Sequence, residues 1–88
     1  MTNSSAVAAP LKEMVESLVR SIVEEPEGVT VDEVSGRQET IFEVRVAQPD
    51  IGRVVGREGR VIKALRTLVR AAAARDQKEG RVDIEVLD

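Results

Sequence analysis

The amino-acid sequence predicts a small α+β domain with the element order α-β-β-α-α-β, in which three helices cover one face of a three-stranded mixed sheet. Two observations carry this prediction: apolar residues recur at helical spacing over two long segments, and they alternate with polar residues over three shorter ones. A chain of 88 residues holds one domain. We expect residues 1–9, small and polar, to be a flexible leader and residues 10–88 to form the domain.

The first helix is predicted to begin at Pro10, since proline suits the first turn of a helix. It is expected to end in the segment 24–28, where Pro26 removes a backbone donor and Gly28 opens the turn. Its apolar face consists of Leu11, Met14, Val15, Leu18, Val19, Ile22 and Val23.

Two strands joined by a hairpin are expected next. Val29 and Val31 alternate with polar neighbours, whereas Val34 breaks the phase and predicts an irregular strand end. Residues 35–38 have the composition of a hairpin loop. The second strand alternates cleanly, with one face made of Phe42, Val44 and Val46 and the other of Ile41, Glu43 and Arg45.

Two further helices and a last strand complete the pattern. Asp50 ends the second strand and is expected to cap a short helix over 51–55, which Gly56 closes. After Gly59 a long helix is expected to bury one stripe, made of Val61, Ile62, Leu65, Leu68, Val69 and Ala72. A final strand carries Val82, Ile84 and Val86 on one face. Because helices connect it to the second strand, these two strands should be parallel.

The composition excludes several kinds of function. There is no cysteine and no histidine, so the chain has no disulfide, no thiolate metal site and no imidazole base. We therefore expect no enzyme activity, no metal and no cofactor. The first ten residues lack the features of a signal peptide, and no segment is long and apolar enough to span a bilayer, which indicates a cytoplasmic protein without membrane contact.

The charge is unevenly distributed. The chain as a whole carries a net charge of −3, but residues 51–75 contain seven basic side chains and one acidic one, Glu58. Because the local field steers a polyanion, this basic segment favours a nucleic-acid partner. Its basic residues are Arg53, Arg57, Arg60, Lys63, Arg66, Arg70 and Arg75. For Arg70 and Arg75 we favour a solvated helix face, and for Asp83 and Glu85 the exposed side of the sheet.

The most informative segment is the loop Gly56-Arg57-Glu58-Gly59 between the two later helices. Glycine at both ends lets the chain turn tightly and lets another backbone approach closely. The unpaired amide groups at the following helix start form a natural phosphate site, beside which Arg57 and Arg60 add full charges. Glu58 weakens this attraction, or caps the helix start.

Residues 54–63, Val-Val-Gly-Arg-Glu-Gly-Arg-Val-Ile-Lys, resemble the signature of KH domains, and the element order is similar to the type II form of that fold. Together with the sequence on either side, the chain resembles the bacterial KhpA (YlqC-like) family over roughly residues 10–88. KH domains clamp about four nucleotides at such a loop. The resemblance implies single-stranded RNA binding by Gly56, Arg57, Glu58, Gly59, Arg53, Arg60, Lys63, Val55 and Ile62.

The resemblance also implies a homodimer or a heterodimer with a larger KhpB (Jag-type) KH protein. It further implies a role as a post-transcriptional regulator or RNA chaperone linked to cell elongation and division. Aliphatic side chains would line the groove for the bases, with Ile51, Val54, Val55 and Ile62 as candidates. The alternative function is a protein-interaction subunit, in which the sheet face or the first helix forms the interface and RNA contact is secondary.

Overall fold

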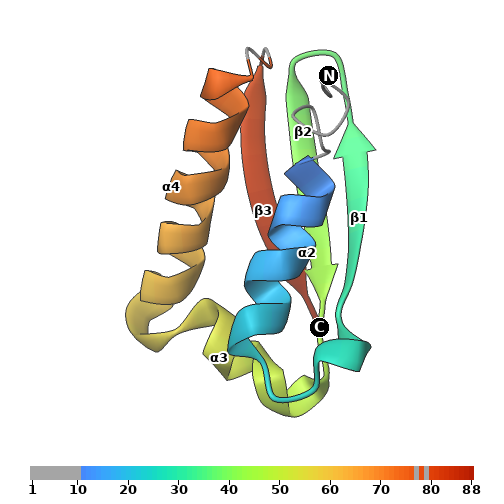
Figure 1. The fold of residues 1–88 in the computed structure, drawn as a ribbon, viewed down its shortest axis with the longest axis vertical. Coiled ribbons are helices and arrows are strands. Elements are labelled where there is room, and N and C mark those ends of the chain that lie inside the picture. Colours follow the sequence, from blue (N-terminus) through green and yellow to red (C-terminus); the bar gives the residue numbers. More distant parts are fainter. Residues whose placement is uncertain (1–10, 77, 79) are drawn as a thin grey trace, which may run out of the picture.

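The computed structural model describes residues 11–76, 78 and 80–88, and within them the predicted element order is confirmed (Figure 1). The expected flexible leader and Pro10 lie outside these residues. The helices are α2 (Leu11–Ile22), α3 (Ile51–Val55) and α4 (Arg60–Arg75), and the strands are β1 (Thr30–Ser35), β2 (Glu39–Arg45) and β3 (Arg81–Leu87). Short 3₁₀ turns cover Pro26–Gly28, Gln48–Asp50 and Arg57–Gly59.

The sheet has the strand order β1-β2-β3, with β1 antiparallel and β3 parallel to β2, as predicted. The register of the hairpin is continuous from Thr30 opposite Arg45 to Ser35 opposite Thr40. The expected irregular end of the first strand is therefore wrong. Val34 keeps its place in the ladder opposite Ile41 and lies on the sheet face away from the helices, where it is 49% exposed.

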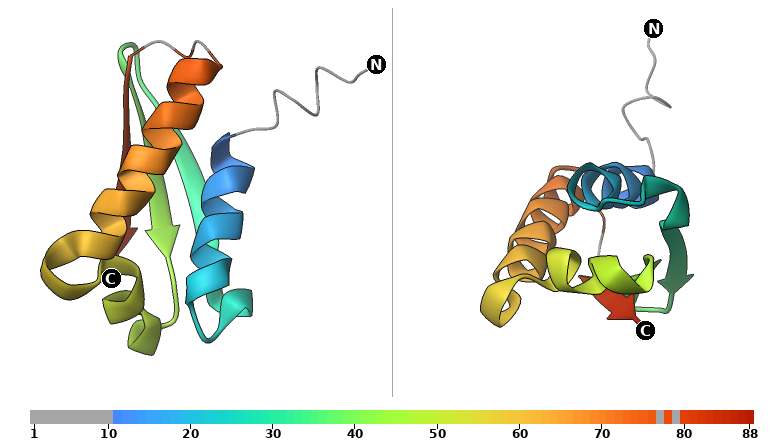
Figure 2. Two further views of the ribbon diagram at one scale, coloured as in Figure 1. Left: turned by 60° about the vertical axis from the view of Figure 1, so that its left-hand side comes forward. Right: turned by 90° about the horizontal axis from the view of Figure 1, so that it is seen from below.

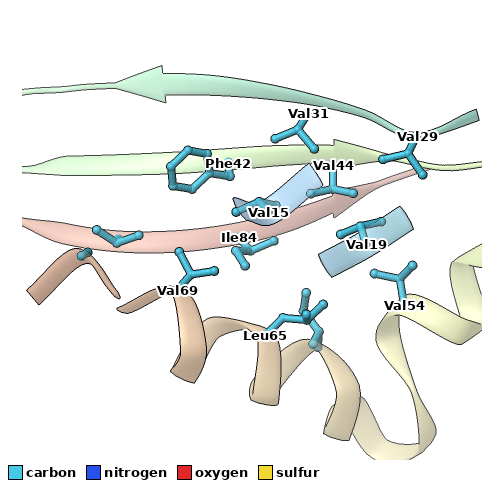
Figure 3. Close-up of a cluster of buried hydrophobic side chains, with 13 residues drawn as sticks. Val15, Val19, Val29, Val31, Phe42, Val44, Val54, Leu65, Val69 and Ile84 are labelled. Atoms are coloured by element: carbon cyan, nitrogen blue, oxygen red, sulfur yellow. The ribbon is translucent and has the colours of Figure 1, made fainter. Parts of the chain in front are cut away.

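The hydrophobic core lies between the sheet and the helices, which all pack on one face of it (Figure 2). Val15 and Val19 of α2 are fully buried there, opposite Phe42 and Val44 of β2 (Figure 3). These contacts follow from the two periodicities, because every third or fourth helical residue and every second strand residue point the same way. Burial of this aliphatic surface is the main term that stabilises the domain.

The buried stripe of α4 differs from the predicted one at Leu68. The helix buries Ile62, Leu65, Val69 and Ala73, whereas Leu68 is 50% exposed. At 3.6 residues per turn, position 68 lies on the flank of the stripe that positions 62, 65, 69 and 73 define. The assignment of Leu68 to the core was wrong. Its large aliphatic side chain lies at the surface of α4.

Asp50 has a different role from the expected one. Its side chain makes no capping hydrogen bond to α3 and is almost fully buried. Its two carboxylate oxygens instead accept hydrogen bonds from the backbone N–H groups of Glu24 and Glu25, both at 3.0 Å. A buried carboxylate needs such donors. Asp50 thereby ties the start of α3 to the segment that follows α2.

None of the helices in the described residues has the length and apolar content needed to cross a membrane.

Candidate nucleic-acid interface

The loop between α3 and α4 is shaped by its two glycines. Gly56 has φ 79° and ψ 170°, and Gly59 has φ 74° and ψ 17°. The Gly56 N–H donates to the carbonyl of Gly52 at 2.8 Å and closes α3, and the Gly59 N–H donates to the carbonyl of Gly56 at 3.1 Å. Residues with a Cβ atom rarely adopt such positive φ angles, so these positions favour glycine.

Gly56 also lies against the first turn of α4. A Cβ atom at this position would come within 2.8 Å of the Val61 backbone nitrogen and would also collide with the Val61 side chain. A Cβ at Gly59 would meet nothing closer than the Cε of Lys63, at 3.7 Å. The first glycine thus permits close packing between loop and helix, whereas the second is required only for its backbone angle.

Glu58 occupies a left-handed conformation between the glycines, with φ 56° and ψ 26°. It does not cap α4, whose first turn receives no side-chain cap. Its carboxylate lies 3.6 Å from the Arg60 guanidinium, and both side chains are about three-quarters exposed. An exposed ion pair of this kind contributes little to stability. Glu58 therefore acts on the charge of the loop rather than on the helix end.

The loop contains backbone N–H groups that are available to a ligand. Among the residues that the structure describes, no backbone acceptor is recorded for the N–H groups of Arg57 and Glu58. These two residues open the turn that leads into the 16-residue helix α4, whose first turn adds the partial positive charge of a helix N-terminus. Such a group of N–H donors binds anions.

The basic residues predicted for the site lie in three different settings. Arg57 is exposed on the loop, with no ion pair recorded in the described part of the chain, and Lys63 is exposed one turn into α4. Arg60 is exposed too, but it forms the ion pair with Glu58. Arg53 instead turns to the end of α2, where its Nη2 donates to Glu24 at 2.6 Å. The loop itself is thus flanked by Arg57, Arg60 and Lys63.

The apolar candidates divide between surface and core. Val55 and Ile51 are half-buried beside the loop, whereas Val54 and Ile62 belong to the hydrophobic core. Phe42, the one aromatic residue of the sequence, is fully buried. Any base held near this loop would therefore lie on aliphatic side chains, with no aromatic ring to stack on.

Sequence reasoning missed an arginine cluster at the free edge of β3. Arg66 and Arg70 of α4 are not simply solvated: Arg66 donates to the Ile84 carbonyl through Nε and Nη2, and Arg70 donates to the Val82 carbonyl at 2.7 Å. Both also contact the Asp83 carboxylate, at 2.8 Å and 3.4 Å. Arg70 is exposed and Asp83 lies on the outer sheet face, as expected, but the prediction missed that both side chains are paired in this cluster.

The charge of Asp83 is stabilised by this cluster. Partial burial works to raise the pKa of its carboxyl, but the hydrogen bond from the Ile84 N–H and the charges of Arg66, Arg70 and Arg81 outweigh burial and hold that pKa below its usual value. The spacing of Arg66 and Arg70, four residues apart opposite an acidic residue in an edge strand, was the one available signal. In the described residues no group of three or more acidic side chains could hold a metal ion.

The element order and the glycine-bracketed loop at the start of α4 define a type II KH domain. The chain belongs to the KhpA/KhpB KH-domain family, which matches residues 12–84. It is 45% identical over 74 residues to the RNA-binding protein KhpA of Clostridium perfringens, covering 84% of this chain and 99% of that relative.

Two other relatives give a similar picture. The RNA-binding protein KhpA of Clostridium acetobutylicum is 42% identical over 77 residues, covering 88% of this chain and all of the relative. The protein of the same name from Chlamydia pneumoniae is 41% identical over 78 residues, covering 89% and 97%. No solved structure matches the chain significantly.

Proposed function

We propose that this protein binds single-stranded RNA by holding the sugar-phosphate backbone at the loop Gly56-Arg57-Glu58-Gly59. The observation that carries the proposal is the pair of N–H groups of Arg57 and Glu58, just before α4, for which the described residues record no backbone acceptor, next to the exposed Arg57 guanidinium. Backbone amides and a helix N-terminus complement a phosphate without a metal or an imidazole. The names of the relatives, all RNA-binding proteins, support the same activity.

The chemistry of the loop defines the kind of binding we expect. Phosphate contacts position a strand but read no sequence, and the half-buried Val55 offers a base only a small aliphatic surface. We therefore infer weak binding with little sequence preference and without catalysis. We further infer a cytoplasmic role as a post-transcriptional regulator or RNA chaperone, linked to cell elongation and division as the family resemblance implies.

The test is a pair of variants with the same change in charge. The double variant Arg57→Asp and Glu58→Asp gives the neutral loop two negative charges, and Arg75→Asp makes the same net change at the other end of α4, about 22 Å away. We expect the loop variant to lose most of its affinity for a labelled short single-stranded RNA in fluorescence anisotropy, and Arg75→Asp to lose little. Circular dichroism checks the fold of both. A folded loop variant that binds the RNA as tightly as the wild-type protein would refute the proposal.

A second candidate function is assembly with another protein, either a second copy or a larger KH-containing partner. The observation that favours it is Leu68, a large aliphatic side chain that α4 leaves half-exposed. Leu68→Lys should then shift the protein from dimer to monomer in light scattering while its circular dichroism spectrum stays unchanged. A wild-type protein that is monomeric alone, and that retains no protein partner after nuclease treatment, would argue against this function.

A further inference from the structure

A hollow of about 480 Å³ lies between α4 and the free edge of β3. It begins one helical turn after the glycine loop, because Lys63 is one of its lining residues. The others are Arg66, Thr67, Arg70, Arg81 and Asp83. Four of the six side chains are basic and one is acidic. We call this hollow the arginine groove.

The arginines of this groove are anchored on one side only. Arg66 uses Nε and Nη2 to hold the Ile84 carbonyl and Asp83, and Arg70 uses Nε and Nη2 to hold the Val82 carbonyl and Asp83. For the Nη1 groups of both, the described residues provide no recorded acceptor. Because a guanidinium carries five N–H donors, each side chain keeps donors for a ligand while the strand fixes its place.

The groove is continuous with the loop. Lys63, Arg66 and Arg70 follow Gly59 at intervals of three or four residues, which places them on one side of α4. From Lys63 to Arg70 the helix rises about 10 Å. A strand whose phosphates are held at the loop can therefore extend along these side chains.

Asp83 opposes the positive charge of the groove. It pairs in register with Ile41 and alternates with the buried Val82 and Ile84, so it lies on the sheet face away from the helices, and Arg66 and Arg70 reach it around the strand edge. Its Oδ1 lies 2.8 Å from Arg66 Nε, and its Oδ2 lies 3.3 Å from Arg81 Nη2. A phosphate entering the groove meets donors that this carboxylate already engages.

The two backbone carbonyls make Asp83 dispensable for placing the arginines. Arg66 retains both of its hydrogen bonds to the Ile84 carbonyl without Asp83, and Arg70 retains the 2.7 Å bond to the Val82 carbonyl. The contribution that disappears with the carboxylate is its negative charge. Removing that charge leaves the donors in position and raises the attraction for an anion.

We propose that Asp83 limits the affinity for RNA that extends from the glycine loop along the arginine groove, by acting as the counter-charge of Arg66 and Arg70. The inference rests on the proposed RNA binding by the loop. It assigns Asp83 the role of a residue that sets affinity through the arginines, without itself contacting RNA.

The deciding variant is Asp83→Asn, which keeps an oxygen for the Ile84 N–H and removes the charge. We expect it to bind single-stranded RNA up to about eightfold more tightly at 50 mM salt than the wild type. Its affinity should also fall more steeply with salt. Each further phosphate that is neutralised on a single strand adds about 0.7 to the slope of log affinity against log salt concentration. Glu85→Gln is the matched control. It removes the same charge from the same sheet face at an exposed position, for which no ion pair is found among residues 11–76, 78 and 80–88.

A variant cycle ties the gain to the arginines. Arg66→Gln with Arg70→Gln should weaken binding, and adding Asp83→Asn to that pair should restore nothing. A gain for Asp83→Asn no larger than for Glu85→Gln overturns the proposal, as does a gain that persists without the two arginines. Asp83→Thr, which is neutral and suits a strand, serves the same comparison if the Asn variant is unstable. A wild-type protein that binds no RNA, or binds it independently of Arg57, would instead refute the loop proposal.

Discussion

Arg53 donates a 2.6 Å hydrogen bond to Glu24, a residue 29 positions earlier in the chain, and its guanidinium is thereby directed to the end of α2. It also lies 3.8 Å from the buried Asp50. Two carboxylates thus share one cation that the sequence places near the glycine loop. The pair links the first helix to the segment that carries the loop, and it reduces the charge that Arg53 can offer to a ligand.

This pairing predicts an order of effects among the arginines. Arg57→Gln should weaken binding to single-stranded RNA more than Arg53→Gln, because Arg57 is exposed and has no recorded ion pair in the described residues, whereas Arg53 is already paired. The salt dependence of the dissociation constant should also fall more for Arg57→Gln. Anisotropy titrations at three salt concentrations measure both. Equal losses for the two variants would contradict the assignment of Arg53 to the α2 contact.

A second prediction concerns Asp50 and stability. Asp50→Ala leaves the N–H groups of Glu24 and Glu25 without their acceptors, so the free energy of unfolding should fall by about 2–4 kcal/mol. Urea denaturation followed by circular dichroism measures this change. Asp32→Ala, at an exposed position of β1, is the matched control and should change stability by less than about 0.5 kcal/mol. If Asp50→Ala lowers the free energy of unfolding as little as Asp32→Ala does, the two hydrogen bonds to the Asp50 carboxylate do not stabilise the fold.

The two glycines of the loop should differ in their tolerance of alanine. Gly59→Ala meets no steric contact and should cost only the strain of a positive φ, about 1–2 kcal/mol. Gly56→Ala adds a collision with the Val61 backbone and should destabilise the protein by clearly more, since backbone cannot move aside as a side chain can. Thermal unfolding of the two variants makes the comparison. A Gly56→Ala protein as stable as Gly59→Ala would contradict the close packing of loop and helix.

The lowered pKa of Asp83 predicts a pH-dependent contribution to stability. Because the carboxyl binds its proton less readily in the folded protein than in the unfolded chain, its contribution is fully present above the unfolded pKa of about 4 and is lost as the pH falls through the lower folded value. The difference in unfolding free energy between wild type and Asp83→Asn should therefore be constant near neutral pH and shrink below about pH 4. Urea unfolding at pH 7, 5, 4 and 3 measures it. A difference that stays the same at pH 3 would exclude the ion pairs as its source.

The elements of this fold follow from the sequence because apolar spacing is a local property. The alternation of Phe42 and Val44 and the helical repeat of Val15 and Val19 predict both the elements and their buried faces. Leu68 shows the limit of the same reasoning: it belongs to the apolar pattern of α4, but the width of the buried stripe is decided by what packs against the helix. That information is absent from the helix itself.

Of the candidate site, too, only part could be predicted from the sequence. The loop Gly56–Gly59 could be located from the sequence, since glycine spacing and neighbouring charge are local. The roles of Asp50 and Asp83 could not, because each depends on partners brought together by the fold: Asp50 meets N–H groups about 25 positions away, and Asp83 meets Arg66 across the strand edge. A carboxylate in isolation does not indicate whether water or protein will surround it.

The place of β3 in the sheet has a consequence for how the protein is made. β3 supplies the buried Val82 and Ile84 and pairs in parallel with β2, the central strand, although some 35 residues separate the two strands in the chain. The β1–β2 hairpin can pair as soon as it leaves the ribosome, but without β3 one edge of β2 stays open and the core is incomplete. Folding must then wait until residues 81–87 have emerged, so a nascent chain arrested before them should remain sensitive to protease.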